Sequence, residues 1–183
     1  GGRLRVISVA RLLWQKGIDD FVATVKEIRA QGLEDKFEFT IVGPQDNDHP
    51  DRLREADIKD FLSLGVSWTD WTANIESFYR SHHVLLFMSH REGAPRAILE
   101  ASATGLPTVG ANTVGVRELV RDCDTGFLVE LHDVKAIVGK LLVYANDDEL
   151  RVKHGLSARR NIAEPLSLKN ATGAQYEMYA SSE

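Results

Sequence analysis

The chain has 183 residues, of which 43% are hydrophobic and 27% are charged, and its formal net charge is −5 at pH 7. These values are typical of a globular domain, and the negative charge disfavours binding to nucleic acid, which usually needs a basic patch. The single cysteine, Cys123, excludes an internal disulfide and predicts a reducing, cytoplasmic compartment. We expect Cys123 to be a small, semi-buried residue rather than a nucleophile.

No apolar run approaches the roughly 20 residues that a membrane-spanning helix needs, and the start is not that of a signal peptide. Gly1 and Gly2 stand directly before an apolar strand pattern. We therefore expect the chain to be part of a longer protein.

Strand and helix patterns alternate from the start. Apolar runs predict strands over 5–10, 37–43 and about 65–68. Apolar residues at helical spacing predict a helix from Ile18, with Asp19 and Asp20 at its positive end, and another over about 52–62.

The alternation continues in the second half. Strands are predicted over 84–88, 107–111 and 126–129, with helices near 74–80, within the stretch 91–107 and, as a short turn of helix, around Arg117. The region from His132 onward reads as helices, broken at Pro165, with an amphipathic segment at 167–180.

The predicted strands are apolar on both faces, and such strands need helices above and below them. The sequence therefore predicts an α/β fold, a doubly wound parallel sheet of about six strands flanked by helices. We find no repeat, low-complexity tract or linker, so we treat residues 1–183 as one domain.

Ligands of open parallel sheets bind at the loops that follow the strands. Arg11 and Lys16 follow the first strand, whereas the loop after 84–88 carries His90 and Glu92. Cations on one loop and carboxylates on another suit a ligand that combines a polyanion with hydroxyl groups. A nucleotide sugar is such a ligand.

The stretch 91–107, REGAPRAILEASATGLP, combines two glutamates with a predicted helix start. Pro95 suits the first helical position, which would leave the N–H groups near Gly93, Ala94 and Arg96 free to face an anion. Glu100 lies one turn after Arg96, so it either pairs with Arg96 or binds a ligand.

Two motifs in this sequence resemble those of a known family. RLLWQKG at 11–17 resembles the R-x4-K-G loop, and Glu92-x7-Glu100 the E-x7-E motif, of retaining GT-B glycosyltransferases in the large group 1 family of bacterial O-antigen and capsule transferases. The segment 115–133 and the tail ending in QYEMY are also similar. The resemblance implies that residues 1–183 form the Rossmann-like, C-terminal, donor-binding half of a GT-B fold, without the N-terminal acceptor domain.

The resemblance also implies roles for individual residues. Arg11 and Lys16 would bind the donor diphosphate and stabilise the leaving nucleotide, and Glu92 would contact the transferred sugar; these three form the expected catalytic set. Glu100 would bind the ribose hydroxyls. The remaining expected donor-binding residues are Gly93, Ala94, Pro95 and Arg96, with His90 either lining the site or lying outside it.

The function implied is transfer of a hexose or N-acetylhexosamine, with retention of configuration and without a metal, from a nucleotide sugar for which the family favours UDP. The acceptor would be a lipid-linked saccharide in O-antigen or lipopolysaccharide assembly, bound through the N-terminal domain, with the enzyme peripheral at the cytoplasmic face of the inner membrane. The isolated domain would bind nucleotide without catalysing transfer. The alternatives are a nucleotide-sugar epimerase of GT-B-like architecture and a non-catalytic α/β binding module.

Several departures and competing motifs remain. The family's usual E-G-F-G is Glu92-Gly93-Ala94-Pro95 here, which leaves the sugar open, and Cys123 stands where glycine is common. Asp46-Asn47-Asp48 has the D-x-D spacing of another transferase class, but the flanking prolines favour a solvated turn. The histidines show no metal-ligand spacing, and three aromatic residues are expected in the core rather than stacked on a base: Trp68, Trp71 and Phe78.

Overall fold

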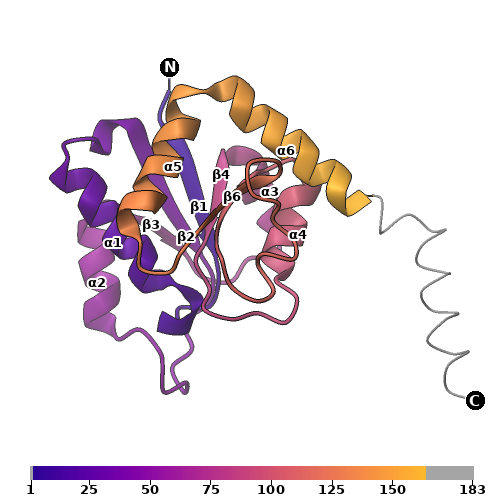
Figure 1. The fold of residues 1–183 in the computed structure, drawn as a ribbon. Helices are drawn as coiled ribbons and strands as arrows, with labels where there is room; N and C mark the ends of the chain where they lie inside the picture. Colours follow the sequence, from indigo (N-terminus) through magenta and orange to yellow (C-terminus); the bar gives the residue numbers. More distant parts are fainter. Residues whose placement is uncertain (1, 164–183) are drawn as a thin grey trace, which may run out of the picture.

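Six parallel strands form the centre of the molecule, in the order β3-β2-β1-β4-β5-β6 (Figure 1). The computed structural model describes residues 2–163. The strands are β1 Leu4–Val9, β2 Phe37–Val42, β3 Ser67–Thr69, β4 Val84–Phe87, β5 Thr108–Ala111 and β6 Gly126–Val129. The doubly wound parallel sheet predicted from the sequence is thus confirmed.

Side chains of the strands alternate between two hydrophobic clusters, one on each face of the sheet. In β1, Val6 belongs to the first cluster, whereas Ile7 belongs to the second. All four residues of β4 are buried. Such strands need cover on both faces, because either face left in water would expose a row of apolar side chains.

Helices supply that cover (Figure 1). Helices α1 Ile18–Ala30, α2 Glu55–Ser63 and α5 Val134–Asn146 contribute to the first cluster, and α3 Ile75–Ser81 and α4 Arg96–Ala103 contribute to the second. Helix α6, Asp148–Ala163, packs against α4 and α5. Two short 3-10 helices, Trp14–Lys16 and Glu34–Lys36, precede α1 and β2.

The strand order reverses direction between β1 and β4. Strands β2 and β3 lie on one side of β1, and β4, β5 and β6 lie on the other. Strand β1 pairs with β2 on one side and with β4 on the other, both in parallel. The loops that follow β1 and β4 therefore leave the same edge of the sheet and diverge to opposite faces. In open α/β sheets this is where ligands bind.

Some local expectations were wrong. The segment around Arg117 forms hydrogen-bonded turns rather than a helix. Pro95 is the residue before α4, not its first residue, with φ −72° and ψ 93°. Trp71 is 72% exposed, and Cys123 is exposed rather than semi-buried. Trp68 and Phe78 do pack against the two clusters, while the expected segment 167–180 lies outside the described residues.

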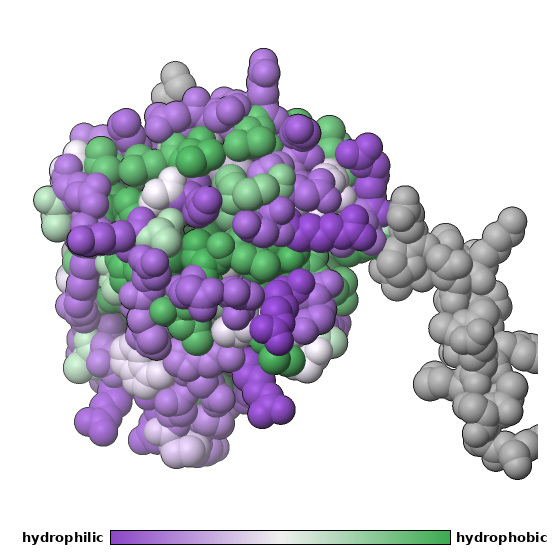
Figure 2. Space-filling view, viewed as in Figure 1, coloured by the Kyte–Doolittle hydropathy of each residue, from purple (hydrophilic) through white to green (hydrophobic). Residues whose placement is uncertain are grey.

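Apolar residues interleave with hydrophilic ones on the face drawn in Figure 2. Exposed large apolar residues on the last two helices are Val143, Val152 and Leu156. Among residues 2–163, no helix has the length and hydrophobicity that crossing a membrane requires.

Candidate functional site

The predicted cations and carboxylates meet at the reversal point of the sheet. Lys16 ends the 3-10 helix that follows β1, and Glu92 lies in the loop between β4 and α4. Gly17 allows the two loops to touch: its φ is 76°, and a β-carbon there would collide with the backbone of Met88. The close approach brings Lys16 within reach of Glu92.

Lys16 and Glu92 form a direct ion pair. Lys16 Nζ lies 2.7 Å from Glu92 Oε1, and their side chains are 20% and 15% exposed. Ser89 Oγ donates a 2.7 Å hydrogen bond to the same carboxylate oxygen. Lys16 and Ser89 both bind Glu92 Oε1, and Oε2 has no partner among the described residues. Glu92 Oε2 can therefore accept a hydrogen bond from a ligand hydroxyl.

The backbone of Glu92 is held by the turn that follows β5. Glu92 N–H donates to Val114 O at 3.2 Å. Gly115 adopts φ 89°, and a β-carbon at this position would collide with the carbonyl group of Glu92. The turn around Arg117, although not a helix, therefore has a clear structural role beside the site.

Glu100 accepts a hydrogen bond from Tyr79, a residue that was not predicted from the sequence. Tyr79 OH, from α3, donates to Glu100 Oε2 at 3.2 Å, whereas Arg96, 88% exposed, lies 3.7 Å from Glu100 Oε1. Burial, reinforced by the Glu100 carboxylate, raises the pKa of Tyr79 above its ordinary value, so the phenol remains a donor. Both hypotheses for Glu100 remain compatible with this geometry, because its side chain is 39% exposed.

Glu100 and Arg11 line the same hollow, a cavity of about 260 Å³ at the carboxyl ends of β1 and β2. The exposed indole of Trp71 lines it as well. The cavity thus combines a cation, a carboxylate and an aromatic ring. Its lining is completed by Val9, Ala10, Val42, Gly43, Pro44, Thr72 and Ile75.

Arg11 is not free in this structure. Its guanidinium lies 2.9 Å from Asp46 Oδ2, and the two side chains are 51% and 27% exposed. The first aspartate of the D-x-D spacing therefore belongs to the edge of the site. A phosphate could replace this partner, since an exposed ion pair holds its members weakly.

The start of α4 presents free backbone donors. The N–H groups of Gly93, Ala94 and Arg96 donate to no group within residues 2–163. Gly93, Ala94 and Pro95 also line a second hollow, of about 350 Å³, with Leu99, Val114, Gly115, Glu118 and Leu119. An anion or a sugar beside this loop could satisfy these donors.

His90 points elsewhere. Its backbone N–H donates to Gln15 O at 3.0 Å, but its ring lies beside Asp19 and His132. It lines neither of the two hollows just described. The ring of His90 thus lies in a cluster with Asp19 and His132.

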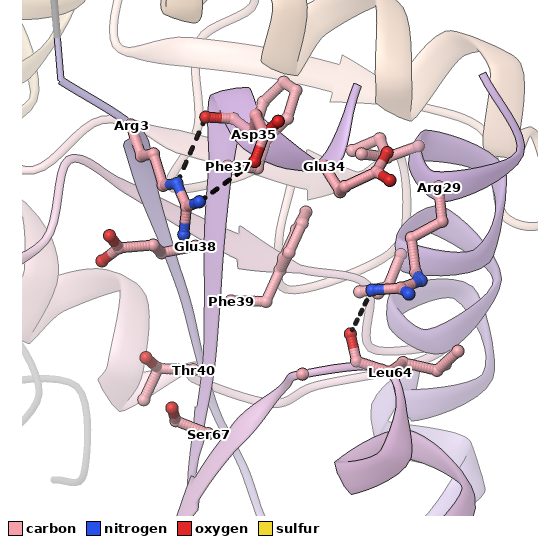
Figure 3. Close-up of a pocket in the computed structure, with 13 residues that line it drawn as sticks. Arg3, Arg29, Glu34, Asp35, Phe37, Glu38, Phe39, Thr40, Leu64 and Ser67 are labelled. Carbon is pink, nitrogen blue, oxygen red and sulfur yellow. Dashed lines mark hydrogen bonds and ion pairs between the residues drawn. The ribbon is translucent and has the colours of Figure 1, made fainter. Parts of the chain in front are cut away.

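A further cavity, of about 300 Å³, lies at the amino ends of the first strands (Figure 3). Arg3 pairs with Asp35 at 3.1 Å, and Arg29 donates to Leu64 O at 3.2 Å across this hollow. It opens on the edge opposite to Glu92. The reversal point of the sheet, not this hollow, carries the convergent charges.

Sequence reasoning missed Tyr79, Trp71, Asp46 and Ser89 as parts of the site. Tyr79 occupies an ordinary buried position of an amphipathic helix, and only the crossing of α3 and α4 reveals its contact with Glu100. Trp71 follows the shortest strand, β3, and its position after that strand was the one available indication that it could reach the carboxyl edge.

A Rossmann-like domain with cations, carboxylates and free N–H groups at its reversal point is the class that these features define. The family model described as Glycosyl transferases group 1 matches residues 3–147, and the chain belongs to this family.

Two curated relatives illustrate the similarity. CapM, a capsular polysaccharide biosynthesis glycosyltransferase of Staphylococcus aureus, is 29% identical over 163 residues, which cover 87% of this chain and 41% of CapM. The UDP-Gal:alpha-D-GlcNAc-diphosphoundecaprenol alpha-1,3-galactosyltransferase of Escherichia coli is 33% identical over 150 residues, covering 79% of this chain and 37% of that enzyme. The chain thus spans about two fifths of the length of these relatives.

Solved structures share the fold. HepE of Anabaena, crystallised with UDP, superposes with a TM-score of 0.85 at 19% identity, covering 98% of this chain and 49% of HepE. The C-terminal domain of the group 1 glycosyltransferase LpcC of Francisella tularensis superposes with a TM-score of 0.70 at 19% identity, over 90% of this chain and 87% of that domain. The fold is therefore that of the C-terminal, Rossmann-like half of GT-B enzymes.

Proposed function

We propose that this chain is the donor-binding domain of a retaining glycosyltransferase that uses a UDP-sugar. The observation that carries the proposal is the presence of two cation–carboxylate sets at the carboxyl edge of the sheet: Lys16 pairs with Glu92, and Arg11 and Glu100 line one cavity. The cations suit a diphosphate, and the carboxylates suit the hydroxyl groups of ribose and sugar.

Arg11, Lys16 and the free N–H groups at the start of α4 provide the leaving-group stabilisation. When the bond between sugar and diphosphate breaks, negative charge develops on the diphosphate. Fixed donors aimed at that charge stabilise the transition state without reorganising. Lys16 is held in place by Glu92 at 2.7 Å, so its amine is positioned before the donor arrives. The proposal includes catalysis without a metal ion.

Glu92 and Glu100 have different tasks in this proposal. Glu92 Oε2 accepts a hydroxyl of the transferred hexose or N-acetylhexosamine, because Oε1 is already bound by Lys16 and Ser89. Glu100 accepts the ribose hydroxyls in the 260 Å³ cavity, where Trp71 can stack on the base.

The choice of UDP and of a lipid-linked acceptor is supported by similar proteins. The Escherichia coli relative is described as using UDP-Gal and a diphosphoundecaprenol-linked acceptor. A Campylobacter jejuni relative, 26% identical over 157 residues, is described as an N-acetylgalactosaminyltransferase acting on a diphospho-undecaprenol acceptor. We extend this to transfer onto a lipid-linked saccharide at the cytoplasmic face of the membrane, in surface polysaccharide assembly, with the acceptor bound by an N-terminal domain.

Calorimetric titration of the chain with UDP, GDP and ADP tests the proposal. We expect UDP to bind most tightly, with the same affinity whether Mg²⁺ is added or withheld. Arg11→Ala and Lys16→Ala should each weaken binding by about 1.5–3 kcal/mol, the range for hydrogen bonds to charged groups.

Lys26→Ala is the matched control, because Lys26 is an exposed cation of α1 that pairs with Asp60, away from this edge. Equal affinities of wild type, Arg11→Ala and Lys16→Ala would contradict the proposal. Strict dependence on Mg²⁺ together with loss of binding in Asp46→Asn would assign the diphosphate to a metal at Asp46 instead. In a full-length enzyme, interconversion of free nucleotide sugars without an acceptor would indicate an epimerase.

A further inference from the structure

Three potential metal ligands converge beside the donor site, although they are far apart in the sequence. Asp19 lies in the first turn of α1, His90 lies in the loop between β4 and α4, and His132 lies in the loop between β6 and α5. One candidate ligand atom from each residue lies within 4.8 Å of the other two. The rings of His90 and His132 stand nearly perpendicular, with centroids 5.5 Å apart.

Two atoms of this cluster have no hydrogen-bond partner in the part of the chain that the structure describes. Asp19 Oδ1 and His90 Nε2 are both shielded from solvent, and neither is bonded to any group in residues 2–163. They lie 3.9 Å from each other, which is too far for a hydrogen bond. A buried polar atom without a partner is costly, and two of them facing each other indicate that something binds between them.

The third ligand is held in position by a buried carboxylate. Asp20, 2% exposed, accepts the backbone N–H of His132 at 3.1 Å through Oδ2 and contacts ring Nδ1 at 3.1 Å through Oδ1. His132 Nδ1 also lies 3.7 Å from Asp19 Oδ2. Carboxylates that orient histidine rings in this way are common around metal ions.

We propose that Asp19, His90 and His132 bind one Zn²⁺ ion, with Asp20 as the residue that positions His132. Two imidazoles and one carboxylate form a donor set that suits zinc. Ligand atoms about 2.0–2.1 Å from a tetrahedral zinc lie roughly 3.4 Å apart. Asp20 binds His132 through Nδ1, so Nε2 is the ring nitrogen left for zinc, and the 3.9 Å between Asp19 Oδ1 and His90 Nε2 needs only a small side-chain movement to reach that geometry.

Access and charge also suit an ion. The side chains of Asp19, His90 and His132 are 37%, 35% and 63% exposed, so the ion can enter from solvent and water can complete its coordination. The carboxylates of Asp19 and Asp20 together supply negative charge that compensates a divalent cation. Sequence spacing gave no indication of the site, because one ligand lies in helix α1 and the other two lie in different loops.

The ion would join the elements that carry the donor site. Asp19 lies shortly after Lys16, and His90 lies shortly before Glu92, so the same two segments would be linked by the Lys16–Glu92 pair and by zinc. His132 would add the loop after β6. Zinc binding does not depend on the proposed transferase activity, and it can be measured with the metal alone.

The test is titration of the metal-free chain with Zn²⁺ in competition with a chromophoric chelator, followed by thermal unfolding with and without Zn²⁺. We expect one Zn²⁺ per chain and an unfolding temperature that rises with zinc concentration. Co²⁺ in place of Zn²⁺ should give the visible absorption of tetrahedral coordination. His132→Asn and Asp19→Asn should each weaken zinc binding by at least about tenfold.

His132→Asn removes the imidazole and is expected to preserve the backbone, because His132 has φ 63°, a left-handed conformation that asparagine also adopts readily. Without metal it should still unfold in one cooperative transition, at a somewhat lower temperature than wild type because the ring contact with buried Asp20 is lost, and this shows that the fold is retained. His49→Asn, which removes an imidazole outside the cluster, should leave zinc affinity unchanged. Absence of one-to-one binding, or equal affinity in wild type, His132→Asn and Asp19→Asn, would overturn the proposal.

Discussion

At the scale of single residues, Glu100 shows how a buried partner can orient a carboxylate at the edge of a cavity. Tyr79 OH binds one oxygen, Oε2, and the carboxylate still lines the cavity with Arg11 and Trp71. The sequence predicted an acid that either pairs with Arg96 or binds a ligand. It could not predict Tyr79, because a tyrosine on the buried face of a helix looks like any other core residue.

The variant Glu100→Gln distinguishes a Glu100 that binds the ligand from one that only stabilises the fold. If Glu100 binds the ribose, the variant should weaken UDP binding by about 1.5–3 kcal/mol and should no longer distinguish UDP from its 2′-deoxy analogue. Calorimetry with both nucleotides measures this. Tyr79→Phe should instead lower the free energy of unfolding by about 1–2 kcal/mol, because it removes a buried hydrogen bond to a charged group.

Arg96→Ala serves as the control for Glu100, since Arg96 is 88% exposed and its pairing with Glu100, at 3.7 Å, should contribute less than about 1 kcal/mol to stability. A purely structural Glu100 would give the opposite result. In that case Glu100→Gln would lower stability and leave the affinity for UDP unchanged.

Cys123 is a second residue whose role becomes clear only from the backbone. It adopts φ 61° and is exposed, in the turn between Val120 and β6. A left-handed conformation costs a non-glycine residue roughly 1–2 kcal/mol, which gives a physical reason for the glycine common in the family at this position. Cys123→Gly should therefore raise the free energy of unfolding by up to about 1 kcal/mol, after the greater freedom of glycine in the unfolded chain is subtracted.

Chemical denaturation of Cys123→Gly measures this difference. Cys123→Ser is the matched control, because it removes the thiol and keeps the β-carbon that makes the left-handed conformation unfavourable. An equal gain in both variants would attribute the effect to the thiol rather than to the backbone.

At the scale of elements, the sequence predicted all six strands, five of them from the hydrophobic pattern that burial leaves; β3, which has no buried residue, is the exception. Boundaries shifted by one or two residues, since hydrophobicity does not mark where the ladder hydrogen bonds end. The expected helix around Arg117 was wrong for a different reason. Val116 and Val120 are spaced as on a helix and both are buried, but they belong to successive turns, closed by hydrogen bonds to Thr113 O and Val116 O, that include the left-handed Gly115.

That turn predicts the effect of Gly115→Ala. The variant should lose at least about 1–2 kcal/mol of stability from its left-handed φ alone. The added β-carbon would also collide with the carbonyl group of Glu92, so the loop should move and the Lys16–Glu92 pair should loosen. We therefore expect weaker binding of UDP-sugars as well as lower stability, measured by calorimetry and denaturation.

Gly32→Ala is the appropriate comparison, because Gly32 also has a left-handed φ, 67°, but a β-carbon there would meet no atom within 4 Å. Gly32→Ala should lower the free energy of unfolding, because alanine disfavours a left-handed φ, and it should leave the nucleotide affinity unchanged. If both variants behave alike, the contact between Gly115 and Glu92 has no functional consequence.

At the scale of the whole molecule, the order of the strands determines which of the predicted residues lie close together. The sequence indicated that Arg11, Lys16 and Glu92 follow strands, but only the neighbouring positions of β1 and β4 bring their loops together. The contact of Arg11 with Asp46 and the approach of His90 to Asp19 were beyond sequence reasoning for the same reason. Each contact joins segments that lie close together only because of the order of the strands in the sheet.

His83, the residue before β4, is hydrogen-bonded to β1 and makes stability depend on pH. Burial, with repulsion from Arg151 of α6 and Arg5 of β1, lowers the pKa of His83 to about 4. Its Nδ1 accepts the backbone N–H of Arg5 at 3.1 Å, an interaction that requires the neutral ring. The pKa values of His82 and His154 are lowered mainly by burial as well.

The direction of the pH dependence follows from these shifts. An unfolded histidine has a pKa of about 6.5, so between about pH 4 and pH 6.5 the unfolded chain binds more protons than the folded chain. The stabilisation is complete above pH 6.5 and is lost as the pH falls towards 4. We expect the free energy of unfolding to decrease over this range, as measured by denaturation at a series of pH values.

His83→Asn isolates the contribution of this residue, since asparagine keeps an acceptor for Arg5 N–H but cannot take up a proton. Carboxylates contribute equally to both proteins, so the difference between the two pH profiles reports His83 alone. The variant should lose less stability than wild type between pH 6.5 and pH 4. Parallel profiles would mean that the ring of His83 is protonated as readily in the folded protein as in the unfolded chain, and that its contact with Arg5 does not depend on charge.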